Sequence, residues 1–296
     1  MQRLSARPKP RVVKAIEADD LGAAKLLLVE GFPNRSAHFW NQSIKRILRF
    51  AENDKAGVPL GYFLMDGSQP VGLVLTPASI RRSANGSIHT IINLSSWYIR
   101  PDHRWRAGVM LRTILEAHDA SFTDLTPTPE VHRILTAFGF TQISSGIDFH
   151  ALALSALAPA RGAFVRNLHS LQEHFASGIR SSLAAYEEAG CIVADLNAGS
   201  RSYPLLLKKR RVKGLPAARL VYCGSNRALA RHFASLAQFL IGRGILFLET
   251  DAGSLPDLMG HISRPNRVKL MRSRNGFSIS PDITDYLGSE LCLFDF

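Results

Sequence analysis

The chain has 296 residues, of which 46% are hydrophobic and 20% are charged, a composition that excludes a wholly disordered protein. Its length predicts two domains of ordinary size or one large domain. Lys and Arg number 36 and Asp and Glu number 24, so the net charge is +12. That charge favours polyanionic partners such as a phosphorylated cofactor, a nucleic acid or an acidic membrane.

Hydropathy and cysteine usage indicate which classes of protein the chain does not belong to. No apolar run approaches the roughly 18 residues that would span a bilayer, and the basic N-terminus lacks the apolar core of a secretory signal. We therefore expect a cytoplasmic protein with no membrane partner. Cys191, Cys223 and Cys292 are widely spaced, which predicts small core side chains rather than a disulfide framework or a metal site.

The first half of the chain alternates strand and helix signals. Residues 1–11 are basic and contain prolines, which predicts a flexible arm. Hydrophobic periodicity, capping residues and Gly or Pro stops then predict the following elements. They are a strand at 12–16, helices at 21–30 and 36–50, strands at 60–65, 70–76 and 88–99, a helix at 108–118, a strand at 121–125, a helix at 129–138 and extended chain at 140–154.

The second half follows a similar order of elements after a linker at 158–162. The predicted elements are a helix at about 165–189, strands at 191–196, 203–212 and 218–223, a helix at 225–241, a strand at 245–250, a short helix after 253, and closing strands at 267–271 and 290–296. We therefore predict an α/β fold with a mixed sheet and a duplicated architecture. Its domains would be 12–155 and 156–296, although no residue-level repeat is visible.

Residues 93–111 carry the strongest chemical signal. A strand runs into Pro101, a basic loop with Arg104 and Arg106 follows, and a helix begins near Gly108. The start of a helix exposes unpaired N–H groups and the positive end of the helix dipole. With arginines on the approach, this junction predicts an anion site.

These residues resemble the GNAT superfamily of acyl-CoA-dependent N-acyltransferases. Their signature is a strand ending in Pro, then Arg or Gln-Gly-x-Gly-x-Gly or Ala, then a helix. With Arg104 as the leading residue, Trp105, Ala107 and Val109 take the glycine positions. A second register begins at Arg106 and places Ala107, Val109 and Leu111 there.

The resemblance continues into the helix at 129–138, which ends in Gly139-Phe140 as the last helix of the family does. Leu135 stands where the family often has a general-acid tyrosine. The resemblance thus implies tandem GNAT-like domains, the second degenerate, with acetyl-CoA or another acyl-CoA as donor. An unknown small-molecule or peptide amine would attack the thioester directly.

The resemblance also implies site residues. The long strand would hold the pantetheine arm at Trp97, Tyr98 and Ile99, and the phosphates would contact Arg104, Arg106, Ala107, Gly108 and Val109. An attacking amine must lose a proton, so a general base or a water chain is needed. The candidates for proton handling are Tyr98, Asp124 and Ser96, with Ser95 and His132 as further possibilities.

Two other functions remain open. The positive charge in both halves also suits a tandem GNAT-like enzyme that takes an amino acid from aminoacyl-tRNA, a nucleic-acid partner that we do not favour. The replaced glycines and Leu135 suit a catalytically inactive GNAT-like binding protein. The basic run at 208–213 predicts an edge strand protected by charge or, less favoured, a nucleic-acid patch.

Overall fold

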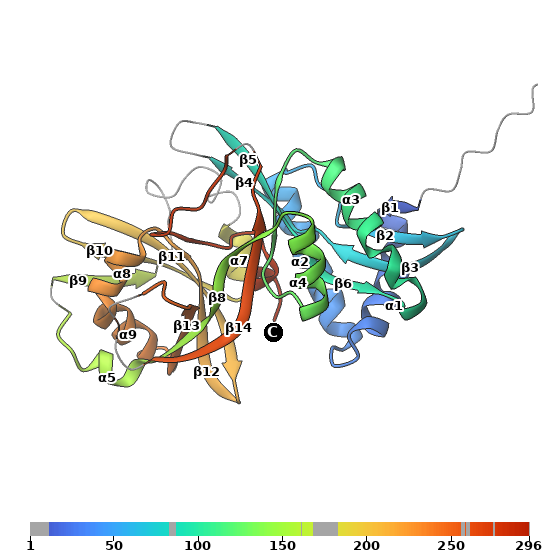
Figure 1. Ribbon diagram of the computed structural model, residues 1–296. Helices are drawn as coiled ribbons and strands as arrows, with labels where there is room; N and C mark the ends of the chain where they lie inside the picture. Colours follow the sequence, from blue (N-terminus) through green and yellow to red (C-terminus); the bar gives the residue numbers. More distant parts are fainter. Residues whose placement is uncertain are drawn as a thin grey trace, which may run out of the picture.

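The computed structural model describes residues 12–82, 87–160, 162–167, 183–255, 258, 261–274 and 276–295 (Figure 1). The predicted arm at 1–11 lies outside the described residues. In Figure 1 the two halves of the chain lie side by side, and the long strands β8 and β14 run between them.

The first half forms most of the elements that its sequence predicts. Ser36 caps α2, since its hydroxyl accepts from the N–H of Phe39 at 3.1 Å, and Thr128 caps α4 through the N–H of Val131. The elements are β1 (Val13–Ala15), η1 (Ala18–Asp20), α1 (Leu21–Gly31), α2 (Ala37–Asp54), β2 (Gly61–Asp66), β3 (Gln69–Leu75), β4 (Ala78–Arg82), β5 (Ile88–Asn93), β6 (Ser95–Ile99), η2 (Pro101–Arg106), α3 (Ala107–Ala117), β7 (Ser121–Asp124), α4 (Pro129–Ala137) and β8 (Thr141–Ala151).

The second half has the same succession of an antiparallel meander, helices and closing strands. Its elements are α5 (Leu152–Ala156), β9 (Ala163–Asn167), α7 (Leu183–Glu188), β10 (Cys191–Ala198), β11 (Arg201–Val212), β12 (Leu215–Cys223), α8 (Asn226–Arg231), α9 (Phe233–Ile241), β13 (Phe247–Asp251), β14 (His261–Arg272), β15 (Thr284–Asp285) and α10 (Glu290–Leu293). The predicted α/β architecture with a mixed sheet is confirmed.

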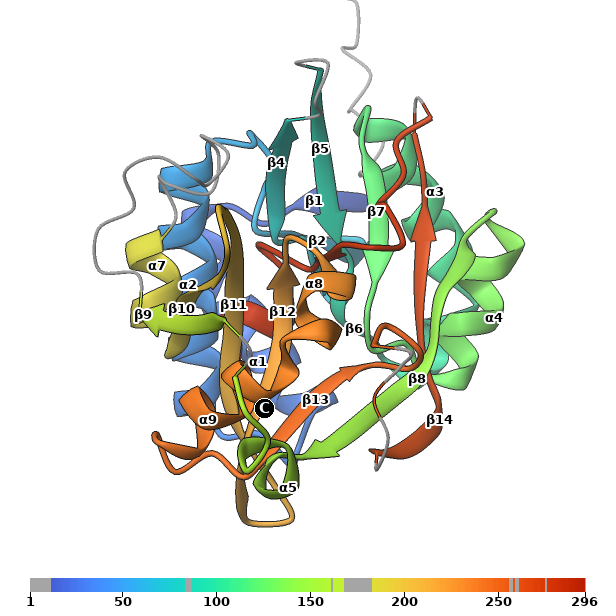
Figure 2. The same ribbon diagram turned by 90° about the vertical axis from the view of Figure 1, so that its left-hand side faces the viewer.

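Two sheets organise the molecule. The smaller has the order β1-β2-β3-β6, and the larger has the order β4-β5-β7-β14-β8-β13-β12-β11-β10-β9, with β15 paired to β12. The last strands of the two halves are exchanged, because β14 lies between β7 and β8 (Figure 2). Hydrogen bonds therefore run from one half of the chain to the other without a break, and the predicted domain boundary near residue 155 stays a prediction.

Several element predictions were wrong. The single strand expected at 88–99 is divided into β5 and β6, which belong to different sheets. Residues 163–167 form strand β9 rather than the start of a helix, whereas 168–182 lie outside the described residues. Residues 290–293 form helix α10 instead of a closing strand.

The basic run at 208–213 does not lie on an edge strand. β11 lies inside the sheet between β10 and β12. The Lys208 ammonium is buried and contacts Asp295 at 2.8 Å, and Arg210 contacts Glu249 at 2.9 Å. The positive charges of these two residues therefore stabilise the fold.

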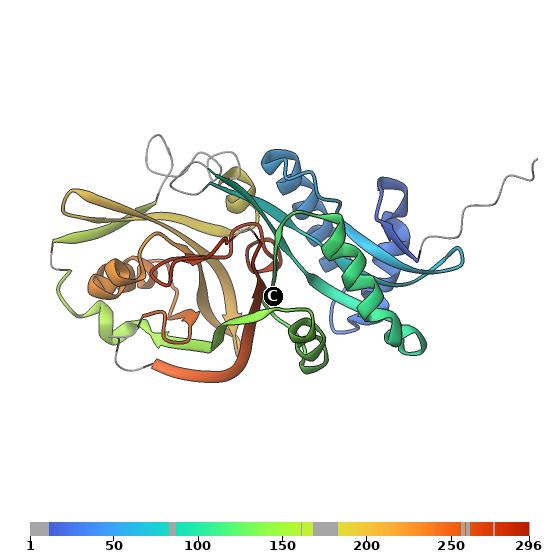
Figure 3. The same cartoon turned by 45° about the horizontal axis from the view of Figure 1, so that its top comes forward.

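The three cysteines are free and buried, as predicted. Cys191 and Cys292 belong to a core cluster shared by both halves of the chain, in which the Phe294 ring packs edge-on against Trp40 at 6.1 Å between centroids. The end of the chain accordingly lies between the two halves (Figure 3).

Candidate functional site

An opening between two neighbouring strands defines the candidate site. β5 runs parallel to β7, with Ile91 opposite Ser121 and Asn93 opposite Thr123. The N–H of Leu94 still donates to the Thr123 carbonyl at 2.7 Å. Beyond that bond the chain turns away and β6 pairs with β3 instead, so Asp124 has β14 on one side and no paired strand on the side of β5 and β6.

The local cause of the turn is a backbone irregularity at Ser96. This residue has φ 52°, in the left-handed region that non-glycine residues rarely adopt. The pairing of β3 with β6 shifts register between Leu73 and Leu75. A bulge of this kind bends a strand and changes the direction of its side chains.

The opening leads into a pocket of about 200 Å³. Its walls come from the start of α2, from the divergence of β6 and β7, from the segment before α4 and from α10. The lining residues are Phe32, Arg35, Trp40, Leu94, Ser95, Ser96, Trp97, Asp124, Thr126, Pro127, Thr128, Val131 and Glu290. Two of the predicted proton-handling residues, Ser96 and Asp124, thus lie in one pocket with Trp97.

Two buried carboxyl groups, those of Asp124 and Glu290, lie in this pocket, and the second raises the pKa of the first. Burial first, and then the neighbouring Glu290 carboxyl, raises the pKa of Asp124 well above its ordinary value. Burial likewise raises the pKa of Glu290, although the hydroxyl groups of Ser95 and Thr126 donate to its carboxylate, the latter at 2.6 Å. Neither carboxyl forms a salt bridge with any residue of the described ranges.

The C-terminal segment brings Glu290 to the first half of the chain. The Glu290 N–H donates to Asn93 Oδ1 at 3.1 Å, and Ser79 Oγ donates to the Leu287 carbonyl at 3.1 Å. Gly288 has φ 68°, and a Cβ there would lie 2.6 Å from the Ser79 side chain. Only glycine therefore allows this close approach.

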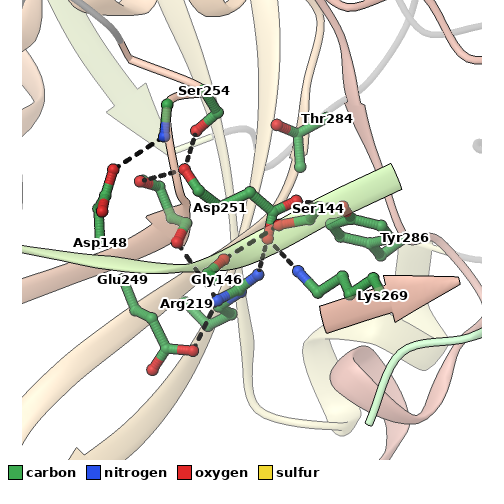
Figure 4. A network of polar contacts seen from close by, with 12 residues as sticks. Ser144, Gly146, Asp148, Arg219, Glu249, Asp251, Ser254, Lys269, Thr284 and Tyr286 are labelled. Carbon is green, nitrogen blue, oxygen red and sulfur yellow. Dashed lines mark hydrogen bonds and ion pairs between the residues drawn. The ribbon is translucent and has the colours of Figure 1, made fainter. Parts of the chain in front are cut away.

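A buried polar network fixes the same segment from the other side (Figure 4). The Asp251 carboxylate accepts hydrogen bonds from Arg219, Lys269 and Tyr286. Burial would raise the pKa of Asp251, but Lys269 and Arg219 bring it below its ordinary value. Because Tyr286 lies four residues before Glu290, this network holds the segment that carries the carboxyl group.

The predicted pantetheine residues do not all face the pocket. Trp97 lines it, whereas Ile99 is buried in the sheet. The Tyr98 hydroxyl donates to Glu30 at 2.9 Å, and its ring lies against Gly31 at the end of α1. Burial, followed by the hydrogen bond to Glu30, raises the pKa of Tyr98.

The expected phosphate loop has an unexpected backbone. The 3-10 helix η2 runs directly into α3, so the helical chain begins at Pro101 rather than near Gly108. The Ala107 N–H donates to the Arg104 carbonyl and is not free for an anion. Arg106 donates to the Met65 carbonyl at 2.8 Å and contacts Asp66 in the β2–β3 hairpin.

Side chains at this junction leave its outer surface accessible. Trp105 is 78% exposed and Val109 is 50% exposed, so neither fills a cleft. On the opposite side, a Cβ on Gly108 would be 3.7 Å from the Phe138 ring beyond α4. The ring and Gly108 are therefore close neighbours.

Arg104 lies near the beginning of α4. The backbone N–H of Glu130 and the Thr128 hydroxyl lower the pKa of Glu130, and Arg133 and Arg104 add to this effect. Two guanidinium groups consequently lie near the start of α4, and Thr128, which caps that helix, lines the pocket.

Sequence reasoning did not find Glu290, Thr126, Trp40 or Phe32. The sequence places Glu290 in a predicted closing strand and Trp40 in a predicted helix. No local pattern marks these residues, because they reach the pocket through contacts between distant segments. Leu135, at the position of the family's tyrosine, is fully buried among apolar side chains.

Comparison with known proteins gives independent support for the fold. No protein-family profile matches the sequence, and no curated protein matches it. Solved structures do match over most of its length. A putative acetyltransferase from Pyrococcus horikoshii has a TM-score of 0.59 at 12% identity, covering 97% of this chain and 98% of that one.

Two further structures agree. A GCN5-related N-acetyltransferase from Anabaena variabilis has a TM-score of 0.57 at 10% identity over 88% of this chain and 72% of its own. A probable N-acyltransferase from Enterococcus faecalis has a TM-score of 0.56 at 10% identity over 93% and 73%. The chain therefore shares the α/β fold of these solved structures. More specifically, it has the GNAT fold in a tandem arrangement, as the sequence resemblance predicted.

Within the described ranges no helix combines the length and apolar character that a membrane crossing requires. The same residues contain no group of three or more His, Cys, Asp or Glu side chains placed to hold a metal ion.

Proposed function

We propose that the protein is an N-acyltransferase that uses an acyl-CoA thioester and acylates an amine in the pocket between β6 and β7. The observation that carries this proposal is the opening beside Ser96, with the Asp124 and Glu290 carboxyls buried in it. The GNAT fold supports a thioester donor, and Trp97 on β6 would lie beside the pantetheine arm.

The carboxyl pair can handle the proton of the amine. Two interacting acids in a desolvated site share one negative charge over a wide range of pH. Glu290 is the better base, because Ser95 and Thr126 donate hydrogen bonds to its ionised form. Its raised pKa brings its basicity closer to that needed near neutral pH.

The reaction is a direct transfer. The amine nitrogen attacks the thioester carbonyl, a C–N bond forms, the C–S bond breaks, and Glu290 takes the proton that the nitrogen loses. The departing thiolate takes its proton from solvent at the pocket mouth, since Leu135 has none to give. Tyr98 remains a candidate acid only if its contact with Glu30 breaks.

The donor's phosphates would bind side chains rather than helix amides. Arg104 and Arg133 lie near the start of α4, and Arg104 is exposed. A guanidinium group is a suitable partner for a phosphate. The predicted contacts at 106–109 stay predictions, although Ala107 and Arg106 already have other partners.

The test is a binding titration with acetyl-CoA by calorimetry, followed by mass spectrometry of an amine panel. Glu290→Gln should lower kcat by about 10²–10⁴-fold, the usual contribution of a general base. Glu116→Gln, an exposed change on α3, is the control and should not alter kcat. Absence of CoA and acetyl-CoA binding at millimolar concentration would rule out the proposal.

A second function is favoured by the altered phosphate loop. A catalytically inactive binding protein would need neither free amides at 107–109 nor a proton donor at Leu135. This alternative predicts ligand binding in the pocket without turnover of any acyl-CoA. Turnover that depends on Glu290 excludes it.

A further inference from the structure

The buried acid pair forms no salt bridge with any residue of the described ranges, although Arg35 also lines the pocket. Asp124 is 5% exposed and Glu290 is 1% exposed, and hydroxyl and amide groups supply all of their hydrogen bonds among the described residues. Among the described residues, no basic side chain lowers the pKa of either carboxyl. Buried charge is costly unless an opposite charge accompanies it.

Aromatic side chains also line the pocket. The Phe32 and Trp40 rings lie 5.3 Å apart between centroids, and Trp40 is 2% exposed. The indole Nε1 atoms of Trp40 and Trp97 are buried without a hydrogen-bond partner in the described part of the chain. A pocket whose lining includes both buried donors without partners and buried acids without salt bridges has the character of a ligand site.

We infer that the acyl acceptor is a compact primary amine with an apolar or aromatic body, which enters as its ammonium ion. The ammonium group binds between Asp124 and Glu290, and the body lies against Phe32, Trp40 and Trp97. To react, the ammonium first loses one proton to solvent, which frees its lone pair, and Glu290 takes the second proton as the C–N bond forms. The acceptor role rests on the proposed acyltransferase function, whereas ammonium binding itself needs no donor. Neutral alcohols and carboxylates of the same shape lack the charge that the acid pair requires.

The chain supplies its own reporter for this binding. Its three tryptophans are Trp40, Trp97 and Trp105, and the first two line the pocket whereas Trp105 is 78% exposed. In a Trp105→Phe variant all tryptophan fluorescence would come from the pocket. Titration of this variant measures ligand binding without acyl-CoA and without turnover.

The probes are 2-phenylethylamine, 2-phenylethanol and 3-phenylpropionate, which share a phenyl ring and differ in charge. We expect the amine to change the fluorescence and to bind at least about tenfold more tightly than the other two. Asp124→Asn and Glu290→Gln, each made in the Trp105→Phe background, should each weaken amine binding by about tenfold. Glu116→Gln in that background should leave the Kd unchanged.

Several outcomes would overturn the inference. They are equal binding of the alcohol or the acid, amine binding that neither acidic substitution weakens, and no fluorescence response to the amine at millimolar concentration. Acetyl transfer to neutral acceptors alone would refute the inference while leaving the acyltransferase function intact. Ammonium binding without acyl-CoA binding would support the ammonium site and refute the acyltransferase function.

Discussion

The two halves of the chain contain the same strand divergence, but only one is left open. In the second half β12 runs parallel to β13 from Ala217 to Arg219, as β5 does to β7. Beyond that point the chain's own C-terminal segment enters the gap, with Asp285 opposite Tyr222 and Thr284 opposite Cys223. In the first half the corresponding gap forms the pocket.

The helix that follows the divergence differs in the same way. At the start of α8 the Asp282 carboxylate accepts from Ser225 Oγ and from the Arg227 N–H, both at 2.8 Å. This acid occupies the position where an anionic ligand would meet a helix N-terminus. One segment, residues 282–290, therefore closes the second opening and supplies Glu290 to the first.

The largest effect should come from the network that holds this segment in the second half. Asp251→Asn leaves Arg219 and Lys269 buried without their shared counter-charge, and should cost about 3–5 kcal/mol in the free energy of unfolding. Urea denaturation measures this loss. The exposed change Asp19→Asn is the control, expected within about 0.5 kcal/mol, and a loss below about 1 kcal/mol for Asp251→Asn would contradict the role of the network.

The open pocket of the first half should lower the folding stability of the ligand-free protein in a pH-dependent way. The closed opening of the second half should have no such effect. Burial raises the pKa of Asp124, so its contribution to stability is present below the unfolded pKa and is lost as pH rises through the folded pKa. Asp124→Asn should therefore raise Tm relative to the unsubstituted chain by an amount that grows from acidic toward neutral pH. Thermal melts across that range measure it, and a difference independent of pH would refute the assignment.

A smaller effect should follow from opening the second half. Asp282→Ala removes the acid at the start of α8 and should cost about 1 kcal/mol, the usual value for a lost cap. The Kd for acetyl-CoA should not change, because the proposed function places the donor in the first half. A change in that Kd would show that the two openings are not independent.

The smallest effect concerns the phosphate junction of the first half. Gly108→Ala places a Cβ at ordinary contact distance from Phe138 and removes a glycine from a helix, which should add about 0.5–1 kcal/mol of stability. If side chains bind the phosphates, the Kd for CoA stays constant in this variant and rises in Arg104→Ala. Loss of CoA binding in Gly108→Ala would instead support the phosphate contacts at 107–109 that the sequence resemblance implies.

The sequence by itself determined most of the order of elements in the first half, together with the fold class. Local signals sufficed for this, because Ser36, Thr128 and Gly139 act on their own neighbours through capping and turn geometry. The motif around Pro101 also located the strand and helix that flank the site. These features depend on residues close together in the chain, so they can be predicted from the sequence.

Only the tertiary structure decided which opening is a pocket and which residues line it. Glu290 reaches Asp124 from the far end of the chain through contacts with Ser79, Asn93 and Ser95. The 3-10 helix that begins at Pro101 uses the Ala107 N–H for its own hydrogen bond, which the sequence motif did not indicate. Burial and charge pairing between distant segments leave no pattern of spacing in the sequence. They determine both the pKa of the carboxyl groups in the pocket and the closure of the corresponding opening in the second half.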